Sequence, residues 1–266
     1  MQSHGISSSL QDNLPRTAVH ASPPVTRQDS FSTMRILTGM SGYSYKEWRG
    51  GFYPADLPAN GMLGYYASRF PTVEINNTFY RMPKETVLLD WAAQVPDGFT
   101  FSLKASRRIT HDHRLGDVGA LLDYLLRNAS VLGPKRGPTL FQLPPNMKKD
   151  VPRLAAFLEL LPRGWQTAIE WRHASWFDEE VYALLRARDI ALVVAESEDG
   201  STPVEATAAW GYLRLHRSGY TDAGLQDWLD RIRAMPWGQA FVYFKHEEEI
   251  AGPPIGLRFQ ELAGLS

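Results

Sequence analysis

The stretch Ala168-Ile-Glu-Trp-Arg-His-Ala-Ser-Trp176 decides the fold prediction, because its apolar run ends in charged and aromatic residues. Burial of such a run brings Glu170 and Arg172 toward a core, where an unpaired charge costs several kcal/mol. The same succession recurs along the chain: a short β-like run, one or two polar residues, and then a helical pattern. This repeat predicts a barrel with a polar mouth.

Eight β-like runs follow this pattern. They are Arg35–Met40, Thr72–Asn76, Phe99–Lys104, Thr139–Leu143, Thr167–Trp171, Ala191–Ala195, Trp210–His216 and Ala240–Lys245. Helical patterns lie between them at Lys84–Val95, Gly116–Leu132, Val151–Leu161, Glu179–Arg188 and Ala223–Met235, the last three after the expected N-caps Asp150, Asp178 and Asp222. This alternation indicates an α/β fold with parallel strands, and eight units favour a closed (β/α)8 TIM barrel in a single domain. An open doubly wound sheet is the alternative, but aromatic residues follow Gly39-Met-Ser-Gly42 where a glycine-rich phosphate turn is expected.

Alternation along the predicted strands directs polar side chains into the barrel. Apolar Val73 and Ile75 share the face that should meet the helices, so Glu74 points inward. The same alternation sends further polar groups inward: Asn76, Ser102, Lys104, Gln142, Glu170, Arg172, Tyr212, Arg214, His216, Tyr243 and Lys245. Because barrels of this type carry their active sites at the carboxyl ends of the strands, we expect one shared pocket there.

Composition excludes several classes of protein. The net charge is −1 over 266 residues, so no global field attracts nucleic acid or a membrane surface. Cysteine is absent, which excludes disulfides, thiolate metal sites and a cysteine nucleophile and favours a cytoplasmic location. No apolar stretch approaches the roughly 20 residues that span a bilayer, so we expect no membrane partner. Residues 1–33 are rich in serine and proline and predict a disordered extension, or a start site assigned too early, before a barrel domain at 34–266.

Long motifs make the chain similar to a known family. They are Gly39-Met-Ser-Gly-Tyr-Ser-Tyr-Lys-Glu-Trp48, Phe52-Tyr-Pro54, Tyr65-Tyr-Ala67, Thr72-Val-Glu-Ile-Asn-Asn-Thr-Phe-Tyr-Arg81, Ile109-Thr-His111, Phe141-Gln-Leu-Pro-Pro145, Glu170-Trp-Arg-His173, Ser175-Trp176 and Tyr212-Leu-Arg-Leu-His216. On these motifs the chain resembles the YecE-like family of barrel proteins, a domain of unknown function. The resemblance implies a (β/α)8 barrel and supplies no reaction. The chain departs from the family's pattern at Arg217, where glycine is expected, and over Val242–His246.

Cationic side chains outnumber carboxylates in the predicted pocket. Lys104, Arg172, Arg214 and Lys245 stand against Glu74 and Glu170. A low-dielectric cleft lined by one sign of charge concentrates ligands of the opposite sign. We therefore expect a small anionic ligand, such as a phosphorylated sugar or a nucleotide-like compound. Mutual neutralisation of these charges within a structural network is the alternative.

The expected chemistry is acid–base catalysis by an enzyme, and it gives each residue a role. Glu170 is the expected general acid or base, Glu74 assists it, and His216 and His173 shuttle protons. The expected substrate-binding residues are Lys104, Arg172, Arg214, Gln142, Asn76, Tyr43, Trp48, Tyr80 and Lys245. The reaction stays open among lyase, isomerase and hydrolase, because all three use such groups. A Schiff-base lysine at Lys104 or Lys245 is a further alternative.

Two other functions compete with this prediction. Histidines near strand ends are potential metal ligands: His111, His113, His173, His216 and His246. The predicted cations beside them would repel a metal, so we expect neither metal nor cofactor. The second function is a nucleic-acid-binding or phosphodiester-processing barrel, with or without a metal. Its phosphate contacts would be Lys104, Arg108 and Arg114, and its affinity would fall steeply with salt. The oligomeric state stays undetermined.

Overall fold

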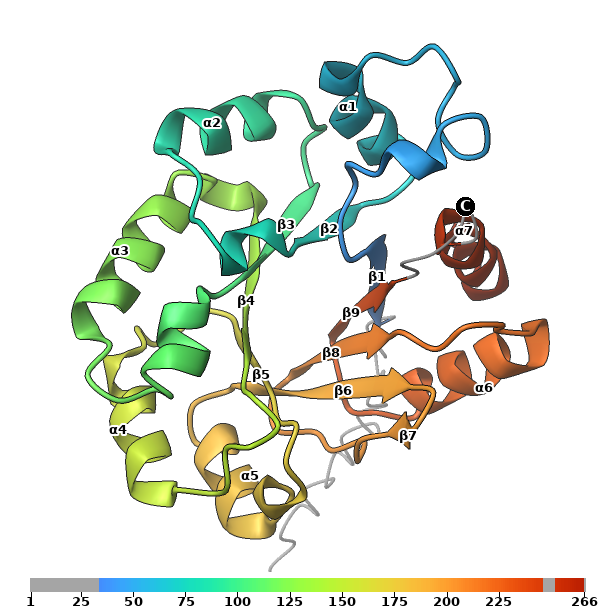
Figure 1. Cartoon of the computed structure of the whole chain (residues 1–266). Coiled ribbons are helices and arrows are strands. Elements are labelled where there is room, and N and C mark those ends of the chain that lie inside the picture. Colours follow the sequence, from blue (N-terminus) through green and yellow to red (C-terminus); the bar gives the residue numbers. More distant parts are fainter. Residues whose placement is uncertain (1–33, 246–251, 266) are drawn as a thin grey trace, which may run out of the picture. The chain divides into compact units, whose positions relative to one another are not determined.

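Parallel strands form a closed ring at the centre of the structure (Figure 1). The computed structural model describes residues 34–245 and 252–265, so the predicted extension at 1–33 lies outside the described residues. The sheet runs in the order β5-β4-β3-β2-β1-β9-β8-β6-β7, and pairing of β5 with β6 closes it. Its parallel strands are β1 (Arg35–Met40), β2 (Thr72–Ile75), β3 (Thr100–Lys104), β4 (Arg136–Gln142), β5 (Thr167–Glu170), β6 (Ala191–Ser197), β8 (Trp210–Leu215) and β9 (Gln239–Phe244). The predicted α/β (β/α)8 TIM barrel is confirmed.

Helices lie around the outside of these strands (Figure 1). They are α1 (Met62–Ala67), α2 (Glu85–Ala93), α3 (Gly119–Ser130), α4 (Val151–Leu160), α5 (Glu179–Arg186), α6 (Asp222–Arg233) and α7 (Gly252–Ala263). All five predicted helices are present, whereas the sequence patterns did not reveal α1 or α7. Within the described ranges, no helix has the length and apolar character needed to cross a membrane.

Two of the three predicted N-caps are confirmed. The side chain of Asp150 accepts a hydrogen bond from the Arg153 N–H, and Asp178 accepts from the amides at the start of α5. The prediction that Asp222 caps α6 is wrong, because the hydroxyl of Thr221 accepts from Gly224 N–H. Asp222 is the first residue of that helix, and its carboxylate pairs with Arg258 of α7 at 2.7 Å.

Apolar residues fill two layers of the barrel. Leu37, Leu140, Ala168, Val193 and Phe241 pack inside the ring of strands and exclude water from its lower part. The apolar residues that alternate with them along the strands face the helices and form the larger clusters outside the ring. The upper part of the barrel interior is left to polar side chains.

The connection from β6 to β8 departs from the strand–helix alternation. Residues 198–209, all of them described, contain the short strand β7 (Gly200–Ser201), which pairs antiparallel with β6, and no helix. Beyond β7 the chain runs back along β6, where the Thr202 hydroxyl accepts from Ala195 N–H and donates to Val193 O.

The neighbouring strand β5 leaves the upper part of β6 free for this contact. Strands β5 and β6 pair only at Ala168–Ala191 and Ile169–Leu192, close to the start of β6. Above these pairs, β5 ends at Glu170 while β6 continues to Ser197. The two strands therefore separate at the mouth of the barrel.

Candidate functional site

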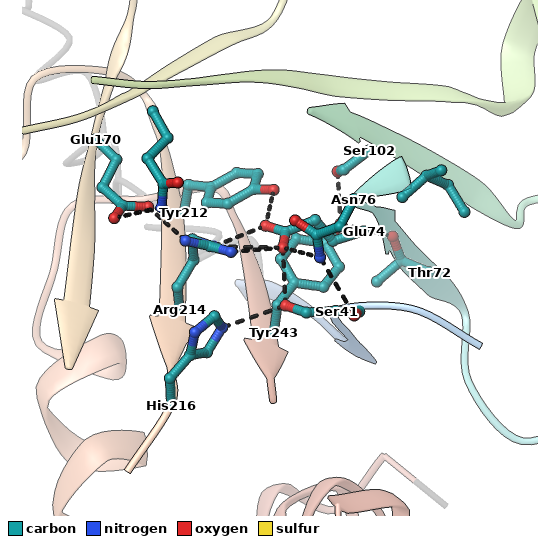
Figure 2. A network of polar contacts seen from close by, with 12 residues as sticks. Ser41, Thr72, Glu74, Asn76, Ser102, Glu170, Tyr212, Arg214, His216 and Tyr243 are labelled. Atoms are coloured by element: carbon teal, nitrogen blue, oxygen red, sulfur yellow. Dashed lines mark hydrogen bonds and ion pairs between the residues drawn. The ribbon is translucent and has the colours of Figure 1, made fainter. Parts of the chain in front are cut away.

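A buried network of two carboxylates and one guanidinium closes the upper barrel (Figure 2). Arg214 of β8 donates from Nε to Oε2 of Glu74 at 3.0 Å and from Nη1 to Oε2 of Glu170 at 2.6 Å. All three side chains are at most 5% exposed. Glu74 lies on β2 and Glu170 on β5, so this ion-paired triad links strands that are not neighbours in the sheet.

The carboxylate of Glu74 is saturated with hydrogen-bond donors. Besides Arg214, it accepts from Tyr212 OH at 2.7 Å and from Ser41 Oγ at 2.8 Å. Asn76 Nδ2 donates to it at 3.1 Å. Burial alone would raise the pKa of this carboxyl, but the charge of Arg214 and these donors lower it overall. Glu74 is therefore ionised near neutral pH and has no free lone pair aimed at a ligand.

Glu170 is held in a similar way at the end of β5. It accepts from Gln142 Nε2 at 2.8 Å and from Arg172 Nε at 3.0 Å, in addition to Arg214. Burial opposes ionisation, yet the charges of Arg214 and Arg172 bring the pKa of Glu170 down to about 2. The group carries no proton to donate at neutral pH.

A second polar layer lies beneath this triad. Tyr243 of β9 contacts Ser102 Oγ at 2.6 Å and Thr72 Oγ1 at 2.8 Å (Figure 2). These contacts, together with the bond from Tyr212 to Glu74, confirm the predicted inward direction of the alternating residues on β2, β3, β8 and β9. The paired hydroxyls support the carboxylate layer from below.

Above the triad, a pocket of about 420 Å³ opens at the carboxyl ends of the strands. We call it the mouth pocket, and its lining residues are Tyr45, Asn76, Phe79, Tyr80, Lys104, His111, Gln142, Arg172, Arg214, His216 and Lys245. It brings together eight of the predicted site residues, from Asn76 to Lys245 along the chain. Its charged lining residues are cationic, since the carboxylates of Glu74 and Glu170 lie outside this lining.

Lys104 differs from Arg172 and Arg214 in its contacts, because its ammonium lies against an aromatic ring. Its Nζ lies 4.6 Å from the centre of the Phe79 ring, a cation–π contact. Within the described ranges, it forms no ion pair with a carboxylate. Burial, and then the nearby charge of Arg214, lower the pKa of Lys104 to about 8. The ammonium therefore loses its proton only a little above neutral pH.

His216 lies at the end of β8 beside the triad. Its Nε2 is 3.2 Å from Ser41 Oγ, and that hydroxyl already donates its hydrogen to Glu74. Nε2 must then carry the proton and donate to the serine oxygen, which leaves Nδ1 as an acceptor. Burial and the charge of Arg214 hold the pKa of His216 well below 6.5, so the ring is neutral. No hydrogen bond within the described ranges reaches Nδ1.

A second pocket, of about 660 Å³, adjoins the mouth pocket. We call it the lateral pocket, because it opens where β5 and β6 separate. Arg172, Arg214 and His216 line both pockets. The other residues of the lateral pocket are Pro145, Glu170, Trp171, Phe177, Ala195, Glu196, Ser197, Asp199, Gly200, Ser201, Thr202 and Pro203.

Besides Glu74, three predicted site residues lie outside both pockets. Trp48 is 2% exposed and packs against Phe52 in the first loop. Tyr43 lines a separate hollow of about 300 Å³, and burial raises its pKa to about 12. His173 accepts from the Ser175 N–H at the start of the short helix Ala174–Trp176, where it serves as an N-cap.

Some residues of the site carried no role in the sequence prediction. Ser41 follows β1 and bonds both Glu74 and His216, although its motif had been identified. Phe79 supports Lys104 and meets the ring of His111 edge-on at 5.0 Å. Ser41 and Phe79 both lie beyond strand ends, where alternation no longer predicts the direction of a side chain.

The histidines do not form a metal centre in the described part of the chain. No group of three or more His, Cys, Asp or Glu side chains has a suitable arrangement there. His246 lies outside the described residues. Arg108 and Arg114, considered above as phosphate contacts, line neither the mouth pocket nor the lateral pocket.

A closed (β/α)8 barrel with a polar pocket at the carboxyl ends of its strands defines the class of TIM-barrel proteins. Within that class, residues 37–266 match the family described as "Protein of unknown function DUF72". The chain belongs to this family, and the resemblance noted in the sequence is thereby confirmed.

Similar proteins come from several bacteria. UPF0759 protein YecE of Escherichia coli strain K12 is 34% identical over 167 residues, which are 60% of this chain and 58% of YecE. The match to YecE therefore spans less than two thirds of that protein. UPF0759 protein YunF of Bacillus subtilis is 26% identical over 236 residues, 80% of this chain and 79% of YunF.

Two crystal structures share the fold. A DUF72 family protein of Thermotoga maritima aligns with a TM-score of 0.66 at 23% identity, covering 86% of this chain and 99% of the other. A DUF72 family protein of Enterococcus faecalis aligns with a TM-score of 0.74 at 18% identity, covering 87% and 96%. These likenesses show the barrel architecture.

Proposed function

We propose that the mouth pocket binds a small phosphate- or carboxylate-bearing molecule and that the protein is an enzyme using acid–base chemistry on it. The observation that carries this proposal is Lys104, a half-buried ammonium in a pocket whose charged lining residues are cationic. Arg214 and Arg172 oppose the attraction of Glu74 and Glu170 at this side chain, and a bound anion would supply a counter-charge in direct contact with it.

The charge balance of the site supports an anionic ligand. Glu74 and Glu170 together carry two negative charges, and Arg214 and Arg172 carry the two positive charges bonded to them. The network is therefore neutral without Lys104. Half of the Arg172 side chain is exposed, and its Nε is fixed on Glu170, so the guanidinium presents its remaining N–H groups to solvent.

The proton-transfer role in this proposal belongs to Lys104. A group whose pKa is about 8 exchanges its proton readily near neutral pH, as general acid–base catalysis requires. Glu170 holds no proton at that pH, and Glu74 is enclosed beneath the pocket. In the proposed mechanism these two carboxylates hold Arg214, and neutral His216 offers Nδ1 as a hydrogen-bond acceptor. The choice among lyase, isomerase and hydrolase depends on the ligand.

Calorimetric titration with sulfate, inorganic phosphate and sugar phosphates tests the proposal. We expect at least one of these anions to bind the wild-type protein and to raise its melting temperature. Lys104→Met should weaken that binding by about tenfold or more, because a charge-assisted contact is lost. The matched control is Lys148→Met, which removes an exposed lysine outside both pockets. Equal loss in both variants, or no binding by any anion, refutes the proposal.

A further inference from the structure

The lateral pocket continues the mouth pocket sideways through the gap between β5 and β6. The two share Arg172, Arg214 and His216 in their walls, so a ligand seated on Lys104 has open space beside it. Each volume, about 660 and 420 Å³, is within the range of roughly 300–1,000 Å³ that small-molecule sites occupy. A single ligand with two parts fits this arrangement.

The mouth pocket and the lateral pocket differ in the charge of their lining residues. This difference determines which end of the ligand would lie in which pocket. Apart from the shared Arg172 and Arg214, the charged residues of the lateral pocket are carboxylates, whereas those of the mouth pocket are cationic. The carboxylates are Glu170, Glu196 and Asp199, and the cations are Lys104 and Lys245. An anionic group is therefore attracted more strongly to the mouth pocket than to the lateral pocket. The part of the ligand in the lateral pocket is therefore uncharged, and its hydroxyl or amino groups can donate to the exposed carboxylate of Asp199.

The apolar residues that line the lateral pocket indicate the shape of the uncharged part of the ligand. Phe177, Pro145 and Pro203 contribute apolar rings to its wall. Aromatic and proline rings pack well on the faces of planar heterocycles. Strand β7 supplies Ser201 at the rim, where small polar side chains leave room for a group of that size.

From this geometry we infer that the ligand is a nucleoside monophosphate, with its phosphate at Lys104 and its base between Phe177 and the β6–β7 hairpin. The inference rests on the proposed function, because the phosphate occupies the same mouth pocket. In this arrangement His216 lies at the junction, with Nδ1 placed to accept a hydrogen bond from the sugar hydroxyls.

Calorimetry with inorganic phosphate, glucose 6-phosphate, adenosine 5′-monophosphate and adenosine tests the inference. We expect the nucleotide to bind about tenfold or more tightly than inorganic phosphate, because stacking of the base adds to the anion contact. Ser201→Trp fills the lateral pocket from its exposed rim and should weaken nucleotide binding by about tenfold while inorganic phosphate keeps its affinity. Ser201→Ala is the matched control and should bind the nucleotide like the wild type.

A second variant removes the aromatic ring of Phe177 and keeps an apolar side chain in the wall of the lateral pocket. Phe177→Leu keeps an apolar side chain of similar volume and should weaken the nucleotide but not inorganic phosphate. The inference is overturned if the nucleotide binds no better than inorganic phosphate, if glucose 6-phosphate equals the nucleotide, or if Ser201→Trp weakens phosphate and nucleotide alike. Absence of binding by every anion refutes the proposed function itself, and the inference with it.

Discussion

Arg214 reaches Glu170 across the barrel with a 2.6 Å contact from Nη1 to Oε2, while its Nε bonds Glu74 on the opposite side. One guanidinium thus holds two buried carboxylates that come from strands β2 and β5. Within the described ranges, neither carboxylate pairs with another cation of comparable burial, since Arg172 is about half exposed. The upper barrel depends on this single residue for its electrostatic balance.

Replacement of Arg214 by Met should destabilise the protein by about 3–5 kcal/mol, because it leaves two carboxylates buried without their partner. Urea unfolding followed by circular dichroism measures this change in the free energy of unfolding. The triple variant Glu74→Gln, Arg214→Met and Glu170→Gln removes all three charges and should regain much of the loss. If Arg214→Met unfolds at the same urea concentration as the wild type, the ion pairs contribute nothing to stability.

Acid should weaken the protein over a defined range of pH. Glu170 has a pKa of about 2 in the folded state against 4.5 for the free group, and the pKa of Glu74 is also lowered. Between these pH values the unfolded chain binds more protons than the folded chain. The stability that Glu170 contributes is therefore fully present above about pH 4.5 and is lost as the pH falls through about 2. Urea midpoints measured from pH 6 to pH 3 should decrease, and the decrease should be shallower in Glu170→Gln. A midpoint that rises on acidification contradicts the depressed pKa of Glu170.

Anion binding should depend on the protonation of Lys104. Its folded pKa of about 8 lies below the ordinary 10.5, so the ammonium is charged below pH 8 and neutral above it. Sulfate, whose charge is constant in this range, should therefore bind best below pH 8 and lose about tenfold in affinity per pH unit well above it. Lys104→Met should bind weakly at every pH. An affinity for sulfate that stays constant from pH 7 to pH 10 in the wild type contradicts this prediction.

The lowered pKa of Lys104 also affects stability: burial of the charged lysine destabilises the folded state, whereas ionisation of the two paired carboxylates stabilises it. Between about pH 8 and 10.5 the unfolded chain holds the Lys104 proton more tightly than the folded chain does. Stability should therefore rise with pH across this window, and this contribution should be absent in Lys104→Met. Urea midpoints for wild type and variant, compared at pH 7.5 and 9.5, provide the measurement.

Removal of the Ser41 hydroxyl should affect both of its partners. Ser41→Ala deprives Glu74 of one donor and His216 Nε2 of its acceptor, at a cost of about 1–3 kcal/mol. Nitrogen-15 NMR of the imidazole should report the Nε2–H tautomer in the wild type and a mixture in the variant. Ser44→Ala, at an exposed position in the same loop, is the control. A wild-type spectrum showing the proton on Nδ1 would exclude the assigned hydrogen-bond direction.

The alternative of a nucleic-acid surface makes a separate prediction. Arg108 and Arg114 do not line the mouth pocket, so their replacement by Ala should leave sulfate affinity within about twofold. Single-stranded oligonucleotides at low salt test the alternative directly. Binding that both arginine variants weaken, and that falls steeply with salt, would favour that alternative over the small-molecule proposal.

Much of this architecture follows from sequence alternation. The first strand was predicted with its observed limits, and the inward positions of Glu74, Glu170 and Arg214 followed from period-two alternation on three strands. Alternation works there because the apolar partners on each strand must face the helices. It places a side chain in the barrel without revealing which charges bond one another, so the saturation of both carboxylates was not predictable.

The sequence patterns did not predict the structure of loops or of segments rich in glycine or proline, and the reasons are physical. Helix α7 starts with Gly252 and two prolines, which read as a loop although proline is well tolerated in a first helical turn. Strand β4 starts at Arg136, three residues before the predicted start at Thr139. The strand can include Pro138 because this residue lies where the register with β3 shifts, and proline is tolerated at such irregularities. The directions of Tyr43, Trp48 and His173 depend on loop packing beyond the strand ends.

The extended return of the chain after β6 lines the lateral pocket and is held to β6 by its own hydrogen bonds. Thr202 fastens this segment to β6 by hydrogen bonds, while the register of β8 and β9 is set by their own ladder. Residues 198–201 lie outside the pairing of β8 with β9, so we expect changes in them to leave that register in place. Protein engineering that aims to enlarge the lateral pocket can therefore begin with substitutions in this hairpin and keep the barrel strands as they are.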